Sequence, residues 1–100
     1  MSARPDYDSL SGRLRGLLIA LMDVLTPSEL SEVDEFLDHA EFGEALRSLA
    51  WIISEEAKTI SASHFAEIQQ LALDMRMAAE LPPDLVNNVE GSEPGGGDPL

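Results

Sequence analysis

The chain has 100 residues, of which 19 are Asp or Glu and only six are Lys or Arg, so its formal net charge is −13. This length allows one domain, and an apolar content of 44% is enough for one modest core. The absence of cysteine excludes a disulfide scaffold, a Cys-ligated zinc site and a thiol nucleophile. Because nucleic-acid phosphates would repel such a chain, we expect no direct nucleic-acid binding and a basic partner instead.

The first predicted helix spans residues 9–25, where leucines recur at helical spacing, with Asp8 or Ser9 as its N-cap. The longest apolar run of the chain, from Leu17 to Met22, lies within it. A membrane span needs about 20 apolar residues, and no small-residue cleavage site follows this run. We therefore expect no membrane segment, no signal peptide and a cytoplasmic location.

The second predicted helix begins at Thr26-Pro27-Ser28-Glu29 and ends near His39. These four residues combine an N-cap, a proline in the first turn and the glutamate of a capping box. Its apolar stripe contains Leu30, Val33 and Leu37. The Thr26-Pro27-Ser28-Glu29 start is the clearest local signal in the sequence.

The third helix is predicted over residues 42–56, and the fourth runs from the N-cap Ser61 to about Ala79. Pro82 and Pro83 are expected to stop the fourth helix. Its inward-facing residues are predicted to be Phe65, Ile68, Ala72, Met75 and Ala79.

The predicted fold class is all-α, a small antiparallel four-helix bundle, because no segment alternates with period two and the connections are short. We expect an N-terminal extension over residues 1–8 and the bundle over residues 9–80. Residues 81–100 are rich in Pro, Gly and acids and have little apolar surface, so they are predicted to form a flexible acidic tail.

The negative charge is concentrated in the middle of the chain. Residues 28–57 contain nine acids and one base, Arg47, and so carry −8, whereas residues 1–27 are neutral. A helical wheel places Trp51 among polar residues, about 165° from the apolar stripe of its helix. An aromatic ring surrounded by carboxylates is typical of an interface with a basic protein. The predicted partner-binding residues are Glu32, Asp34, Glu35, Asp38, Glu41, Glu44, Trp51 and Glu55.

Two simpler interpretations stay open. The acidic residues can form a solvated face that keeps a small bundle soluble. Trp51 can pack under the first helix or under the tail, since an indole is usually at least partly buried.

Catalytic and metal sites are not indicated by the sequence. His39, Glu41 and Glu44 supply too few ligands for a closed zinc site, and His64 lies on another helix. No nucleophile elbow or phosphate-binding loop is present. Asp8-Ser9-Leu10 matches the modified motif of acyl carrier proteins, but it opens the first helix, where those proteins carry it on the second. We expect no enzyme, no cofactor and no metal.

Residues 25–75 resemble the MafI-type immunity proteins of bacterial polymorphic toxin systems. The resemblance rests on Leu25-Thr-Pro-Ser-Glu-Leu30, on Asp38-His-Ala-Glu-Phe-Gly-Glu-Ala-Leu46, on Ser54-Glu-Glu and on Ile60-Ser61. That family is similar in having an acidic helix, a His-x-Glu-aromatic-Gly segment, an apolar helix, a Glu-Glu pair and an Ile-Ser cap. The resemblance implies an inhibitor that binds a cognate toxin domain and covers its active site, often one that acts on nucleic acid or nucleotides.

Two other functions stay open. One is an adaptor or chaperone for a secreted effector, which would bind through an apolar groove. The other is a self-associating bundle with Leu73 and Met77 as a dimer seam. The free protein is expected to be a monomer or a weak homodimer.

Overall fold

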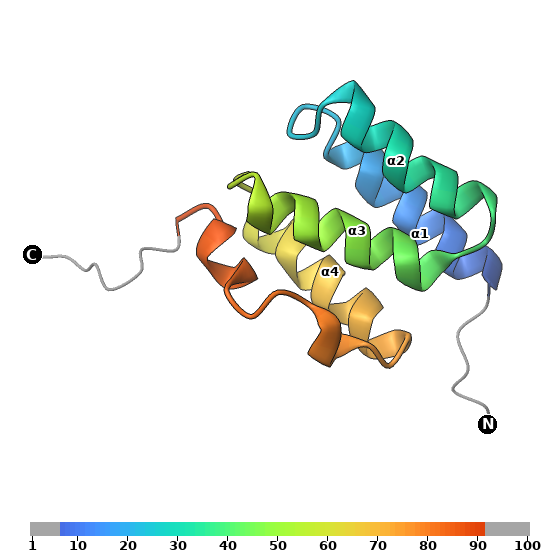
Figure 1. Cartoon of the computed structure of the whole chain (residues 1–100). Coiled ribbons are helices and arrows are strands. Elements are labelled where there is room, and N and C mark those ends of the chain that lie inside the picture. The colour runs from blue at the N-terminus through green and yellow to red at the C-terminus, as the bar shows by residue number, and fades with distance from the viewer. Residues whose placement is uncertain (1–6, 92–100) are drawn as a thin grey trace, which may run out of the picture.

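The structure, a computed structural model, describes residues 7–91 and consists of four α-helices followed by two short 3-10 helices (Figure 1). Successive α-helices run in opposite directions, and α3 contacts α1, α2, α4 and η2. This arrangement confirms the predicted all-α bundle. The elements are α1 (Tyr7–Ala20), α2 (Pro27–Asp38), α3 (Phe42–Glu55), α4 (Ala62–Asp74), η1 (Ala78–Glu80) and η2 (Leu85–Asn88).

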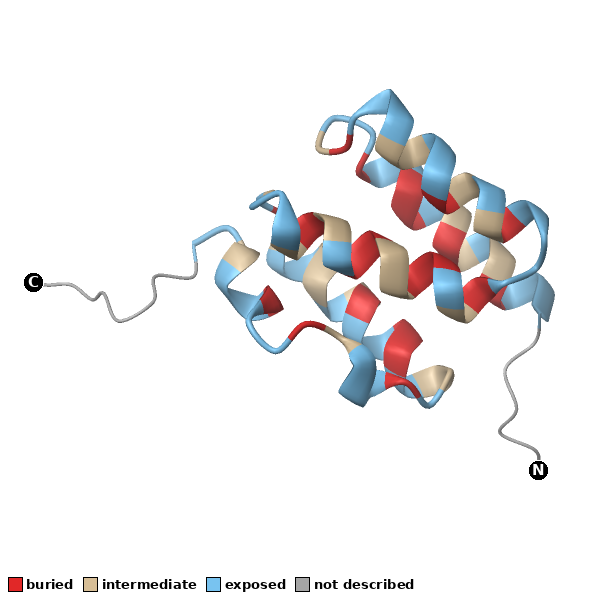
Figure 2. Ribbon diagram, in the orientation of Figure 1, coloured by how far each residue is buried: buried red, intermediate tan, exposed pale blue. Residues whose placement is uncertain are grey.

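The core is formed by the apolar stripes of the four helices, and exposed residues lie on their outer sides (Figure 2). The central helix α3 supplies Leu46, Leu49, Ala50 and Ile53, which are fully buried. No polar or charged residue among residues 7–91 is buried. Hydrophobic burial therefore dominates the stability of the bundle, at about 25 cal/mol for each Å² of apolar surface removed from water.

The predicted starts of α2 and α4 are confirmed. The Thr26 side chain accepts a hydrogen bond from the Glu29 amide at 3.1 Å, and the Glu29 carboxylate accepts one from the Thr26 amide at 2.9 Å. Glu29 also pairs with Lys58 at 3.1 Å, and its pKa is lowered, first by the Thr26 amide and further by Lys58. At α4, the Ser61 hydroxyl accepts from the His64 amide at 3.1 Å.

The first helix differs from its prediction at both ends. It begins at Tyr7, so Asp8 and Ser9 lie in its first turn, and it ends at Ala20. Leu21 and Leu25 are buried as expected, but they lie in turns between α1 and α2. The leucine spacing predicts burial correctly here, because turns with an i→i+3 or i→i+4 bond place side chains on nearly the same side as a helix does.

The fourth helix ends at Asp74, five residues before the predicted end at Ala79. Ala79 is exposed in η1, whereas Leu71, absent from the predicted inward set, is fully buried. Met77 is also buried, so it is covered by the protein's own chain and does not form the suggested dimer seam with Leu73.

The ends of α2, α3 and α4 share one geometry. After the last turn, Ala40, Ala57 and Arg76 have φ values of 57°, 52° and 59°, in the left-handed region. The following amides, of Glu41, Lys58 and Met77, each bond back to the carbonyl five residues earlier, at 2.9, 2.9 and 2.8 Å. This is the Schellman motif, which usually carries glycine at the left-handed position. The glycine signal is missing in all three cases.

Residues 82–91 do not belong to a tail, contrary to the prediction that starts one at residue 81. Leu85 is buried, and the Asn88 side-chain amide donates to the carbonyls of Ile53 and Lys58 at 3.1 and 2.8 Å. Ile60 forms a single parallel bridge with Val89. This segment therefore closes the bundle beside the C-terminal end of α3. The predicted flexible residues after Gly91 lie outside the described residues, as do residues 1–6 of the predicted N-terminal extension.

Within residues 7–91, no helix is long and apolar enough to cross a membrane.

Candidate functional site

The eight predicted partner-binding residues do not form one surface. Four of them gather on and beside the outer side of α3, two face α1, and two lie near the turn between α2 and α3. We define the tryptophan face as the surface formed by the first group together with Ser48. Its residues are Glu32, Glu44, Ser48, Trp51 and Glu55.

The tryptophan face follows from the helical spacing of α3. Residues 44, 48, 51 and 55 are three or four positions apart, so they share one side of the helix, opposite buried Leu46 and Ile53. Glu32 joins them from α2, because the Ser48 hydroxyl donates to its carboxylate at 3.4 Å. The face therefore spans two antiparallel helices.

Trp51 is 41% exposed. More than half of its surface is therefore covered by the chain, and the rest is open to solvent on the outer side of α3. The exposed part of this large aromatic ring is apolar surface in contact with water, and a partner that covers it would gain the free energy of its burial. It is the chief apolar element of the tryptophan face.

Asp34 and Asp38 lie on the opposite side of α2 from Glu32. Counting 100° per residue from buried Val33, they fall on one side of the helix and Glu32 falls about 100° to the other. Both carboxylates bind Arg15 of α1, at 2.9 and 3.2 Å. They hold α1 and α2 together, so their charge is partly neutralised and they are separated from Trp51.

Glu35 and Glu41 are exposed near the C-terminal end of α2. His39 caps this end, and its Nδ1 lies 2.9 Å from the Glu35 carbonyl oxygen. That hydrogen bond raises the pKa of His39; desolvation opposes it, and the charges of Glu41, Glu35 and Asp38 each raise the pKa by a smaller amount. A protonated imidazole also interacts favourably with a helix C-terminus.

Most of the basic side chains of residues 7–91 form ion pairs with carboxylates of the same chain. Arg13 of α1 binds Glu67 and Asp74 of α4, at 3.2 and 2.8 Å, and its hydrogen bond lowers the pKa of Asp74. Arg47 binds Glu44 and Glu80. The carboxylates of residues 7–91 that lack an ion pair are those of Asp8, Asp23, Glu32, Glu35, Glu41, Glu55, Glu56, Asp84 and Glu90.

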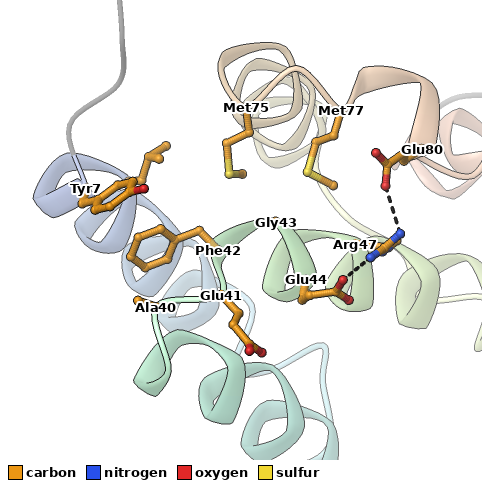
Figure 3. A pocket seen from close by; sticks show the side chains of 11 residues that line it. Tyr7, Ala40, Glu41, Phe42, Gly43, Glu44, Arg47, Met75, Met77 and Glu80 are labelled. Atoms are coloured by element: carbon orange, nitrogen blue, oxygen red, sulfur yellow. Dashed lines mark hydrogen bonds and ion pairs between the residues drawn. The ribbon is translucent and has the colours of Figure 1, made fainter.

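The structure adds a pocket that sequence reasoning missed. It lies at one end of the bundle, has a volume of about 520 Å³, and is lined by Tyr7, Phe42, Glu41, Met75 and other residues from α1, α3, η1 and the adjoining turns (Figure 3). The Tyr7 and Phe42 rings meet edge-on with centroids 5.7 Å apart. No sequence signal indicates this pocket, because its residues are distant in the chain.

An apolar groove of about 440 Å³ lies between the end of α1 and the start of α2. Ile19 and Met22 line it and are 68% and 57% exposed, and Leu18 and Leu30 lie beneath them. Asp34, already bound to Arg15, stands at its edge. Ile19 and Met22 make this groove an exposed apolar feature of the described chain.

The described residues contain no group of three or more His, Asp or Glu side chains placed to hold a metal ion. In comparisons with known proteins, no family model, no characterised protein and no solved structure matches this chain significantly. The geometry of its surface is therefore the basis for a functional interpretation.

Proposed function

We propose that this protein is an immunity protein that binds a cognate bacterial toxin domain with a basic surface and neutralises it by covering its active site. The observation that carries the proposal is Trp51, half exposed on the outer side of α3 among carboxylates. The MafI-type resemblance of residues 25–75 supplies the toxin as the kind of partner.

The unpaired acids explain how such binding would work. Glu32 and Glu55 flank Trp51 and have no cationic partner among residues 7–91. A toxin that acts on nucleic acid or nucleotides needs a basic cleft for phosphates, and the tryptophan face would occupy that cleft. Complementary charge accelerates association, while the buried aromatic ring sets the dissociation rate. Inhibition needs no catalytic chemistry from the immunity protein.

The proposal is tested with the toxin domain encoded beside this gene. The purified proteins should form a complex, and the toxin should lose activity in proportion to the complex formed. A triple variant, E32Q/W51A/E55Q, should weaken the complex at least about 30-fold, because a central tryptophan alone is worth about 2 kcal/mol or more. Failure of the wild-type protein to bind and inhibit the toxin would refute the proposal.

A matched control separates the face from net charge. The variant D23N/E90Q also removes two negative charges, but from exposed carboxylates outside the tryptophan face. It should lower the association rate slightly and leave the dissociation rate unchanged. Circular dichroism of both variants should match the wild type, since none of the substituted side chains is buried. Equal weakening by both variants would move the interface away from Trp51.

The alternative function, an adaptor or chaperone for a secreted effector, is favoured by the apolar groove at Ile19 and Met22. Salt distinguishes the two functions. Binding through the tryptophan face should associate more slowly as ionic strength rises, whereas binding through the groove should depend on salt much less. The variant I19S/M22S should abolish only the second kind of binding.

A further inference from the structure

The pocket at the end of the bundle combines apolar walls with a carboxylate rim (Figure 3). The Tyr7 and Phe42 rings stand on one side, and the Met75 and Met77 side chains extend from the chain after α4. Phe42 and Met77 are buried, whereas Tyr7 is 73% exposed. The pocket therefore has a fixed apolar floor and an open mouth.

The charge of the lining is negative. Arg47 is shared by Glu44 and Glu80, so these three residues retain one negative charge. Glu41 adds a second, and no ion pair neutralises it. Although Glu41 occupies the N-cap position of α3, its side chain makes no capping hydrogen bond. Its exposed carboxylate extends toward α2 at the outer edge of the pocket, where a charged group of a ligand can reach it (Figure 3).

These properties fit one kind of side chain best. Arginine has an apolar stem, a guanidinium that stacks on aromatic rings and a charge that pairs with carboxylates. Thioether sulfur is polarisable and adapts its shape to such a guest. An anion would be repelled by the rim, and a purely apolar side chain would leave the charge of Glu41 uncompensated beside it.

The pocket is also continuous with the tryptophan face, because Glu44 belongs to both. We propose that this pocket binds an arginine side chain of the partner protein and anchors it beside the tryptophan face. The inference rests on the proposed function, since the basic partner supplies the arginine. It assigns a specific anchor to a surface that would otherwise bind by general charge and one tryptophan.

The test uses the full-length protein with ¹³C-labelled methionine methyl groups, observed by NMR. The probe is the tripeptide acetyl-Gly-Arg-Gly-amide, and its neutral isostere carries citrulline in place of arginine. The Met75 and Met77 signals, assigned with M75L and M77L, should shift saturably with the arginine peptide, with a Kd in the millimolar range of about 1–10 mM that suits a single side chain. The citrulline peptide, and a third peptide with lysine in place of arginine, should bind more weakly than the arginine peptide. Met22, which is exposed in the apolar groove, serves as the internal control.

A pair of variants tests the rim. E41Q should weaken the arginine peptide about two- to five-fold, the range expected for one partly exposed charge pair. E55Q makes the same chemical change at the other end of α3, about 20 Å away along the helix, and should have no effect. Both side chains are exposed, so neither change disturbs folding.

Four results would overturn the inference: no shift of Met75 and Met77, equal binding of the citrulline or lysine peptide, an equal shift of Met22, or no effect of E41Q. The outcome is independent of the toxin experiment. A protein that binds the arginine peptide but not the toxin would refute the proposed function, whereas one that binds the toxin but not the peptide would refute only the arginine pocket.

Discussion

Replacing Leu85 with alanine tests whether residues 82–91 close the bundle. Leu85 lies in η2 and is only 2% exposed, although the sequence assigns it to a flexible tail. If the segment packs as the structure describes, the substitution removes three buried carbon atoms from the core. If the segment is a tail, the substitution changes nothing that the folded state buries.

The size of the effect follows from the surroundings of Leu85. Leu→Ala changes in cores cost about 2–5 kcal/mol, depending on how far the site collapses or fills with water. Leu85 borders a surface hollow together with Phe65 and Leu81, so water can enter the space that is left. We therefore expect a loss near the lower end, about 2–3 kcal/mol. For a domain of this size the Tm should fall by about 8–24 °C.

Urea unfolding, followed by far-UV circular dichroism and by the fluorescence of the single tryptophan, measures the loss. Val86→Ala is the matched control, because Val86 is the next residue and is 47% exposed. It should change the free energy of unfolding by no more than about 0.5 kcal/mol. If L85A costs less than about 1 kcal/mol, or no more than V86A, then the segment does not pack on the bundle and the described fold is wrong beyond η1.

Two further predictions concern the helix ends. Ala57→Gly should stabilise the protein by about 0.5–1 kcal/mol, because relief of the left-handed backbone strain outweighs the entropy that glycine adds to the unfolded chain. The control Ala66→Gly, within α4, should destabilise the protein by about 1 kcal/mol in the same urea assay. Destabilisation by both substitutions would contradict the Schellman geometry. Because the folded pKa of His39 is raised above its usual 6.5, its stabilising contribution is fully present below pH 6.5 and is lost as the pH rises through the folded pKa. His39→Asn should therefore reduce the difference in Tm between pH 5.5 and pH 8, and an unchanged difference would show that the bond to the Glu35 carbonyl contributes nothing.

The proposed toxin partner comes from the resemblance alone, whereas the acidic surface by itself indicates only a basic partner. The resemblance rests largely on caps, turns and core positions, whereas the charge argument rests on exposed residues such as Glu32 and Glu55. The peptide experiment on the arginine pocket therefore tests binding without relying on the resemblance, whereas the toxin experiment on the tryptophan face tests both together.

The sequence by itself determined the features that depend on neighbouring residues. The capping box of Thr26 and Glu29, the cap at Ser61 and the position of Trp51 on the polar side of its helix all follow from residues within one or two turns. An N-cap needs a side chain with an acceptor, and an apolar stripe needs only regular spacing. These features depend on residues close together in the sequence, so they can be predicted without knowing the fold.

The tertiary structure decided the features that depend on residues far apart in the sequence. Helix α4 ends at Asp74 because Met77 is buried and Arg76 takes a left-handed conformation. Glycine, the usual sequence signal for that conformation, is absent at this position. Asp38 lies on the α1 side of α2, away from Trp51, where it pairs with Arg15, 23 residues earlier in the chain. Ion pairs, pockets and burial of a terminal segment depend on which distant residues become neighbours. In this protein those contacts, and not its charge of −13 alone, divide the acidic residues into those that hold helices together and those available to a partner.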